Sequence, residues 1–226
     1  MELPGPPRLP SSWHAGLVLR LRRHLVLKLL GISAFMWVFF LGYFHTLGHP
    51  VFPVFQMPIT SLDRLIPFQP QALAAYLSLW LYVGIAPGML LTLREGLVYA
   101  LWIGALCIAG LACFYFWPTA VPPSGIDASG HAGFSLLKGV DAAGNACPSL
   151  HIATGMFSAI WIDRLLHHLR TPTALRVFNG LWFAAIAYST LAIKQHVVLD
   201  VVAGALLGIV FAALAVRRWT WVDVPA

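Results

Sequence analysis

Long apolar runs separated by short polar segments dominate the pattern of hydrophobic and polar positions along the chain. Six of these runs, each of roughly 17–22 residues, are long enough to cross a bilayer as a helix. They predict an all-α, polytopic membrane protein built as a bundle of six transmembrane helices. We place the spans near Leu25–Phe44, Gln71–Leu91, Gly96–Pro118, Leu150–Leu166, Leu175–Ile193 and Val197–Val216.

The polar segments divide the rest of the chain. Residues 1–24 are rich in proline and then basic, so we expect a disordered cytosolic tail. Residues 25–218 are predicted to form one six-helix membrane domain, and residues 219–226 a second cytosolic tail. The first apolar run is too long for the core of a signal peptide and lacks a small-residue cleavage site, so we expect it to remain as a helix. The connections near 45–70 and 119–148 are rich in proline and glycine; the second is either a lid over a site or a plain connector.

Composition supports a membrane environment. The 226 residues are 59% hydrophobic and 10% charged, whereas soluble domains carry about 25% charged residues. The net charge of +6 does not indicate nucleic-acid binding, because the basic residues form no stripe with interleaved aromatics. With the N-terminus inside, Arg64, Lys138 and Lys194 lie outside, and the other eleven of the fourteen basic residues (14 − 3) lie inside, as the positive-inside rule requires. We therefore expect a multi-pass protein of the bacterial inner (plasma) membrane with both termini cytoplasmic.

Two polar stretches lie at the outer ends of these runs. The first is Cys147-Pro148-Ser149-Leu150-His151, and the second runs from Ser189 to Asp200. Proline suits the first position of a helix, and the free N–H groups around Ser149 and Leu150 would then form an anion site. Lys194 adds a positive charge near the start of the last helix.

His196 and Asp200 are four residues apart, which places them on one face of a helix. A carboxylate one turn into the bilayer is costly without a partner, and Asp200 can fix the tautomer of His196. Together the two stretches indicate an enzyme that handles a phosphate at the extracytoplasmic membrane face. We expect no metal and no cofactor.

Other interpretations of these residues stay open. Asp200 could be half of a structural ion pair, the two histidines with Asp200 could bind a metal, and Cys147 could be a nucleophile. The three cysteines have neither the spacing of a disulfide framework nor that of a metal site. The Ser129-Gly130-His131 sequence is similar to a phosphate-binding loop, but no apolar helix follows it, so we interpret it as a loop.

The two stretches, in this order and at these helix ends, resemble the type 2 phosphatidic acid phosphatase (PAP2) superfamily over about residues 25–216. Its second signature is Pro-Ser-Gly-His, where this chain has Pro148-Ser149-Leu150-His151. Its third is Ser-Arg, five residues, His, three residues, Asp, where this chain has Ser189-Thr190, His196 and Asp200 at the same spacing. The Lys and Arg-Pro of the first signature have no basic match in residues 114–123. The Pro148-Ser149-Leu150-His151 sequence, together with the Lys194-Gln195-His196 sequence of the second stretch, is similar to the branch that includes inositol phosphorylceramide synthases.

The resemblance implies a mechanism. His196 would attack phosphorus with Asp200 orienting it, and the product is a phosphohistidine. His151 would protonate the leaving alkoxide and then activate the acceptor. Ser149, the amide of Leu150 and Lys194 would hold the phosphate oxygens, with help from Ser189.

The partners implied are the lipid bilayer and a substrate that is a phospholipid, isoprenoid or sphingolipid phosphate. With water as acceptor the enzyme is a lipid phosphatase, which we favour; with a lipid hydroxyl it is a head-group phosphotransferase. A non-catalytic transporter or scaffold is the alternative from another class, although transporters typically show paired repeats and broken helices. The sequence predicts no oligomeric state.

Overall fold

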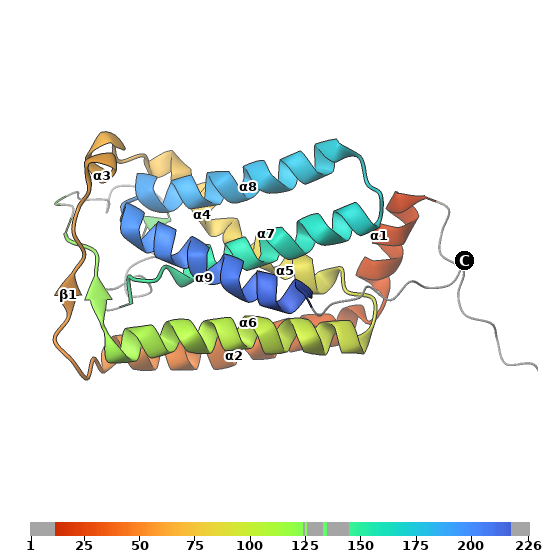
Figure 1. Cartoon of the computed structure of the whole chain (residues 1–226), viewed down its shortest axis with the longest axis horizontal. Coiled ribbons are helices and arrows are strands. Elements are labelled where there is room, and N and C mark those ends of the chain that lie inside the picture. Colours follow the sequence, from red (N-terminus) through yellow and green to blue (C-terminus); the bar gives the residue numbers. More distant parts are fainter. Residues whose placement is uncertain (1–11, 124, 126–132, 135–144, 218–226) are drawn as a thin grey trace, which may run out of the picture.

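The computed structural model describes residues 12–123, 125, 133–134 and 145–217, and it is 75% helical (Figure 1). Two short strands, β1 and β2, lie at one end of the helices. In chain order the elements are α1 (Trp13–Arg22), α2 (Leu25–Gly48), β1 (Phe55–Gln56), α3 (Ser61–Leu65), η1 (Pro70–Ala72), α4 (Leu73–Leu77), α5 (Leu79–Gly88), α6 (Leu93–Phe116), β2 (Thr119–Ala120), α7 (Leu150–His168), α8 (Thr173–Ala192) and α9 (Val198–Arg217).

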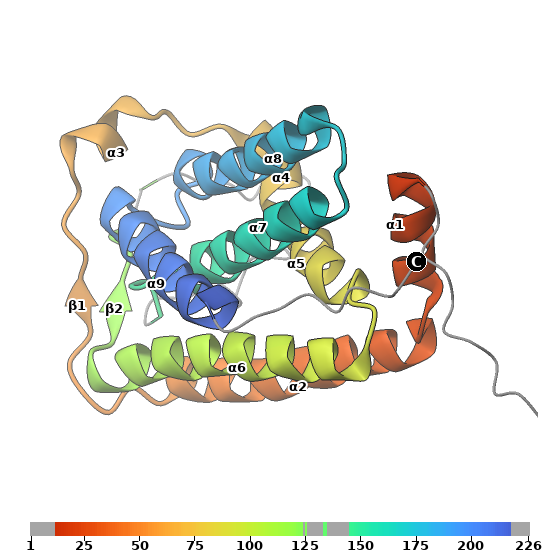
Figure 2. The same ribbon diagram turned by 45° about the vertical axis from the view of Figure 1, so that its right-hand side comes forward.

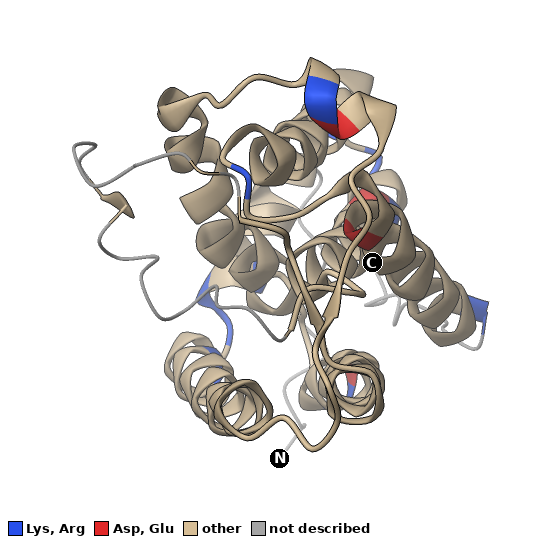
Figure 3. Cartoon of the chain, turned by 90° about the vertical axis from the view of Figure 1, so that its left-hand side faces the viewer, with Lys and Arg blue, Asp and Glu red and all other residues tan. Residues whose placement is uncertain are grey.

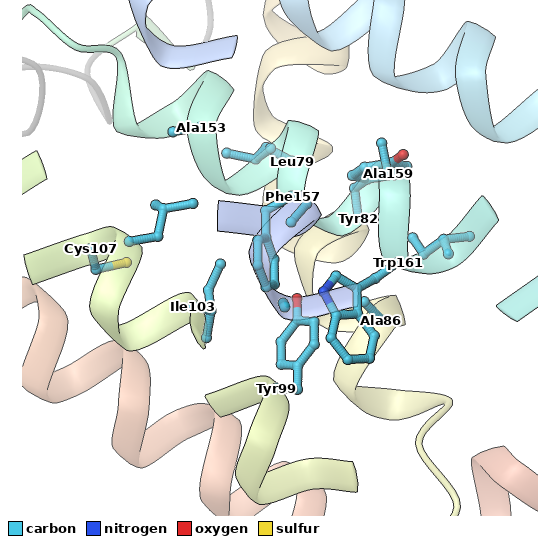
Figure 4. Close-up of a cluster of buried hydrophobic side chains, with 14 of the residues drawn as sticks. Leu79, Tyr82, Ala86, Tyr99, Ile103, Cys107, Ala153, Phe157, Ala159 and Trp161 are labelled. Atoms are coloured by element: carbon cyan, nitrogen blue, oxygen red, sulfur yellow. The ribbon is translucent and has the colours of Figure 1, made fainter. Parts of the chain in front are cut away.

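Helix α7 is the centre of the bundle. It packs against α5, α6, α8 and α9, while α2 lies along α6 (Figure 2). The core between α5, α6 and α7 is built from large buried side chains, including Tyr82, Tyr99, Phe157 and Trp161 (Figure 4). A buried face on each of these helices therefore fixes α7 among its neighbours.

Three helices in the described part of the chain are long and apolar enough to cross a membrane: α2, α6 and α9. Helix α2 contributes no buried residue, and most of its leucines, together with Trp37 and Val38, are exposed. An exposed apolar surface of this length and composition is typical of a helix that faces lipid. Helices α7, of 19 residues, and α8, of 20 residues, correspond to two further predicted spans.

The segment predicted as a single span near 71–91 forms η1, α4 and α5 instead, with an interruption at Ser78. The Ser78 hydroxyl donates to the Ala75 carbonyl at 2.6 Å and accepts from the Trp182 indole N–H at 2.9 Å. A serine hydroxyl that bonds the backbone competes with helix formation. Because one of its partners lies on α8, the local apolar pattern could not reveal the break.

Residues 13–22, which we expected within a disordered tail, form α1 at the end of the bundle opposite β1 (Figure 1). Arg20 is buried, and its Nη1 lies 3.5 Å from Oε2 of the fully buried Glu95. Burial lowers the pKa of Arg20, and the charge of Glu95 opposes that shift. The Lys28 ammonium also donates to the Arg20 carbonyl at 2.5 Å. These contacts with α2 and α6 hold α1 in place.

At the opposite end, three outer segments lie side by side. Strands β1 and β2 are parallel, and Thr119 of β2 also pairs with Asn145. The Cys147 amide donates to the Thr119 hydroxyl at 2.8 Å. The ladder fixes the residues just before α7. Figure 3 views this end and shows charged residues to be few and scattered. The 129–131 loop and the 219–226 tail lie outside the described residues.

Replacing Arg20 by alanine leaves Glu95 buried without its cation, and breaking a buried pair in this way typically costs about 3–5 kcal/mol. We expect Arg20→Ala to lower the midpoint of thermal unfolding in detergent by several degrees. Arg22→Ala is the matched control, because Arg22 is exposed on the same helix. Equal midpoints for the two variants would show that the ion pair does not hold α1.

Candidate active site

The two polar stretches meet where α7 crosses α9. The Ser149 amide donates to the Asp200 carbonyl at 3.1 Å. A Cβ atom on Gly204 would lie 2.3 Å from the Ser149 carbonyl oxygen, and one on Gly208 would lie 2.5 Å from that of Ala153. Two small residues four apart let helix backbones approach this closely. The crossing therefore brings residues some 50 positions apart in the chain, 149 and 200, into direct contact.

His196 and Asp200 form a pair at the start of α9. His196 Nδ1 lies 3.4 Å from Asp200 Oδ2, with the carboxylate fully buried and the imidazole 10% exposed. The same Oδ2 accepts from the Val197 amide at 3.0 Å. Because Nδ1 faces the carboxylate, Nε2 on the opposite side of the ring is the nitrogen free to react. The i,i+4 spacing thus produces the expected contact.

His151 lies in the first turn of α7 between two aromatic side chains. Its ring stacks on Tyr76 with centroids 4.2 Å apart and planes 15° apart, and Trp80 meets it edge-on at 6.4 Å. His151 Nε2 is buried and has no hydrogen-bond partner in the described part of the chain. The stacking holds the ring plane and leaves this nitrogen available to a ligand.

The start of α7 differs in detail from the prediction. The helix begins at Leu150 rather than Pro148, and Ser149 is its N-cap, with Oγ accepting from the Ile152 amide at 3.3 Å. The amides of Leu150 and His151 lack an acceptor among the described residues, which leaves the helix end able to bind an anion. The Leu150 side chain lies against Gly110 of α6, where an added Cβ would be 2.3 Å from it. This glycine provides the space that a leucine at this position needs.

The start of α9 is already occupied. Asp63 of α3 accepts from the Val198 amide at 2.8 Å through Oδ1 and from the Thr60 amide at 2.8 Å through Oδ2. A carboxylate therefore lies at this helix end, which is neutralised within the protein.

Lys194 and Ser189, two of the predicted phosphate ligands, have other partners in the structure. Lys194 sits in the turn between α8 and α9 with φ +63°, and its ammonium donates to the carbonyls of Asp63, at 3.0 Å, and of Ile66. The Ser189 hydroxyl donates to the Ile186 carbonyl at 2.6 Å. The Lys194 side chain therefore ties the α8–α9 turn to the segment that covers it, whereas the Ser189 side chain is bonded within its own helix.

His151 and His196 line one cavity of about 890 Å³. Asn145 and Thr154 also line it, and its remaining walls are mostly apolar side chains of α2, α5 and α6. Along α2 the lining runs from Leu27 to Tyr43, which is about 24 Å at 1.5 Å per residue. The site thus opens onto a long apolar space.

Two alternative chemistries find little support in the geometry. Burial raises the pKa of the Cys147 thiol to about 11, whereas a nucleophilic thiol needs a lowered pKa. The described residues bring together no group of three His, Cys, Asp or Glu side chains that could hold a metal ion.

Comparison with known proteins decides the family. A family model described as the PAP2 superfamily matches residues 97–223, more than half of the chain and inclusive of both polar stretches. The chain belongs to the PAP2 superfamily. PAP2 proteins are phosphatases or phosphotransferases, so this chain has the fold of a phosphoryl-transfer enzyme. No curated protein and no solved structure matches it.

Sequence reasoning missed three residues around the site: Asp63, Tyr76 and Asn145. A signal for Asp63 was present, because Thr60-x-x-Asp63 has the pattern of a capping box, and the structure forms that box. Nothing in the local sequence marks Tyr76 or Asn145, whose partners come from distant segments.

The close crossing of α7 and α9 is testable at Gly204. In Gly204→Ala the new methyl group meets the Ser149 carbonyl and forces the helices apart, which we expect to cost about 1–3 kcal/mol. Gly180→Ala on α8 is the control, because a Cβ there meets nothing within 4 Å. Thermal unfolding in detergent measures both. A Gly204→Ala protein as stable as Gly180→Ala would contradict the packing described.

Proposed function

We propose that this PAP2 protein hydrolyses a lipid phosphate monoester or lipid pyrophosphate at the extracytoplasmic membrane face through a phosphohistidine intermediate. The observation that carries the proposal is the pair His151 and His196 at one end of a long apolar cavity, with a buried carboxylate behind His196. Such a site offers a nucleophile, a proton donor and space for a hydrocarbon chain.

In the first half-reaction, His196 Nε2 attacks phosphorus, forming a P–N bond while the bond to the lipid oxygen breaks. His151 donates its Nε2 proton to that oxygen, and the lipid leaves as an alcohol. Asp200 holds the Nδ1 proton and stabilises the positive charge that develops on the imidazole. In the second half-reaction, His151 accepts a proton from water as its oxygen attacks phosphorus. The P–N bond breaks, and phosphate and free His196 result.

The phosphate oxygens are assigned to the start of α7. Its dipole and the amides of Leu150 and His151 provide donors and partial positive charge, and the Ser149 hydroxyl can add a further donor. Lys194 enters the proposal as the residue that holds the α8–α9 turn, and hence His196, in position, and Ser189 as a residue bonded within the last turn of α8.

The tail of the substrate is assigned to the cavity. The cavity extends about 24 Å along α2. This exceeds the thickness of one leaflet, which is half of a hydrocarbon core of about 30 Å. In the proposed topology the six predicted spans cross the membrane with both termini cytoplasmic. The arginines of α1 and those at the ends of α7 and α9 then face the cytoplasm, in line with the positive-inside rule.

The second candidate is transfer of the phosphoryl group to a lipid hydroxyl. It is favoured by Leu150 in the second signature, which is similar to the inositol phosphorylceramide synthase branch. Both candidates share the first half-reaction and differ only in the acceptor.

Phosphate release from a panel of lipid phosphates, with EDTA present, tests the proposal. We expect the wild-type protein to be active, His196→Ala to be inactive, and His151→Gln to lose about 10²–10⁴ in kcat, the usual contribution of a general acid–base. His167→Gln is the matched control, because His167 is exposed at the far end of α7, and it should behave like the wild type.

Three results would contradict the proposal. Loss of wild-type activity in EDTA would indicate a metal mechanism, and movement of the phosphoryl group intact to a second lipid would establish the transferase. If the wild-type protein neither released nor transferred phosphate from any lipid, with or without an acceptor, the transporter or scaffold would be favoured.

A further inference from the structure

Asn145 is a buried amide whose orientation is fixed by its neighbours. Its exposed fraction is 4%, and its backbone forms a parallel bridge with Thr119 of β2. Its Nδ2 donates to the Tyr43 carbonyl at 3.0 Å and to the Thr46 hydroxyl at 3.2 Å. A backbone carbonyl only accepts, so the atom facing Tyr43 must be the nitrogen. The two bonds to α2 therefore determine where the oxygen lies.

Asn145 Oδ1 is the unpaired half of that amide. It is buried and has no donor within the described part of the chain. A buried acceptor without a donor is destabilising, and an amide oxygen can be satisfied only by a donor. Asn145 lines the same cavity as His151 and His196. The cavity that the two histidines line thus also contains an oriented acceptor suited to an O–H group.

We propose that Asn145 recognises a hydroxyl group on the lipid, close to the phosphate ester. The substrate class is then a lipid phosphate with a hydroxyl-bearing backbone, such as a monoacylglycerol phosphate or a long-chain amino-alcohol phosphate. An isoprenoid phosphate offers no donor at this position and leaves Oδ1 unpaired. The assignment rests on the proposed function, which places the phosphate at His151 and His196.

Equilibrium binding to the full-length protein in detergent tests the inference without depending on turnover. The probes are two non-hydrolysable phosphonate analogues of a monoacylglycerol phosphate, one with its free hydroxyl and one with hydrogen in its place. Both carry the same phosphonate group, so its contribution cancels in the ratio of their affinities.

We expect the wild-type protein to bind the hydroxylated analogue roughly tenfold more tightly, as one hydrogen bond to a buried acceptor predicts. In Asn145→Leu the ratio falls to about one. If Asn145 had only a structural role, Asn145→Leu would weaken the binding of both analogues equally, and the ratio of their affinities would not change. Thr46→Val is the matched control: it removes one bond that holds the amide but keeps Oδ1, and it should retain the wild-type preference.

Any of three results would overturn the inference: equal affinities of the wild type for the two analogues, a preference for the hydroxylated analogue that persists in Asn145→Leu, or no binding of either analogue. If the preference is present and the wild type still releases no phosphate from any lipid phosphate, the inference stands and the proposed hydrolysis fails.

Discussion

The close contact between the backbones of α7 and α9 is the constraint on which the site depends. Gly204 and Gly208 have no side chains to separate the helices, and the Ser149 amide reaches the Asp200 carbonyl. His151 follows Ser149 by two residues and His196 precedes Asp200 by four, so the crossing fixes both histidines at once. A phosphoryl group held between them would lie at the free end of α7, where a partial positive charge is already present.

The site achieves this with few charges. Asp63 closes the start of α9 and Lys194 is bonded to the covering segment. In the proposed function, the groups of the described residues that face the phosphate are then one helix end and two imidazoles. Low polarity around them is an advantage, since electrostatic interactions strengthen where water is excluded. The same apolar walls extend into the cavity and suit a lipid tail. In the proposed function, chemistry and substrate binding are thus two consequences of one arrangement.

Many of the helices and part of the site could be predicted from the sequence, because they depend on the local pattern of residues. Apolar runs predicted α2, α6 and α9, and the four-residue spacing predicted the contact of His196 with Asp200. Features that depend on distant partners could not be predicted. Arg20 is ordered by a residue 75 positions away, Ser78 is bonded to α8, and the orientation of Asn145 comes from α2. The charge of Lys194 and its place two residues before His196 predicted a phosphate ligand, while its bonding partners are Asp63 of α3 and Ile66, just after that helix.

The central claim is that His196 becomes covalently phosphorylated during turnover. The most direct measurement is a rapid quench in base of the wild-type protein with a lipid labelled in its phosphate, followed by mass spectrometry of the peptides. The account predicts a base-stable, acid-labile phosphoryl group on His196 that disappears as phosphate is released. Turnover without any phosphorylated residue, or label on Cys147 or His151 instead, would contradict it.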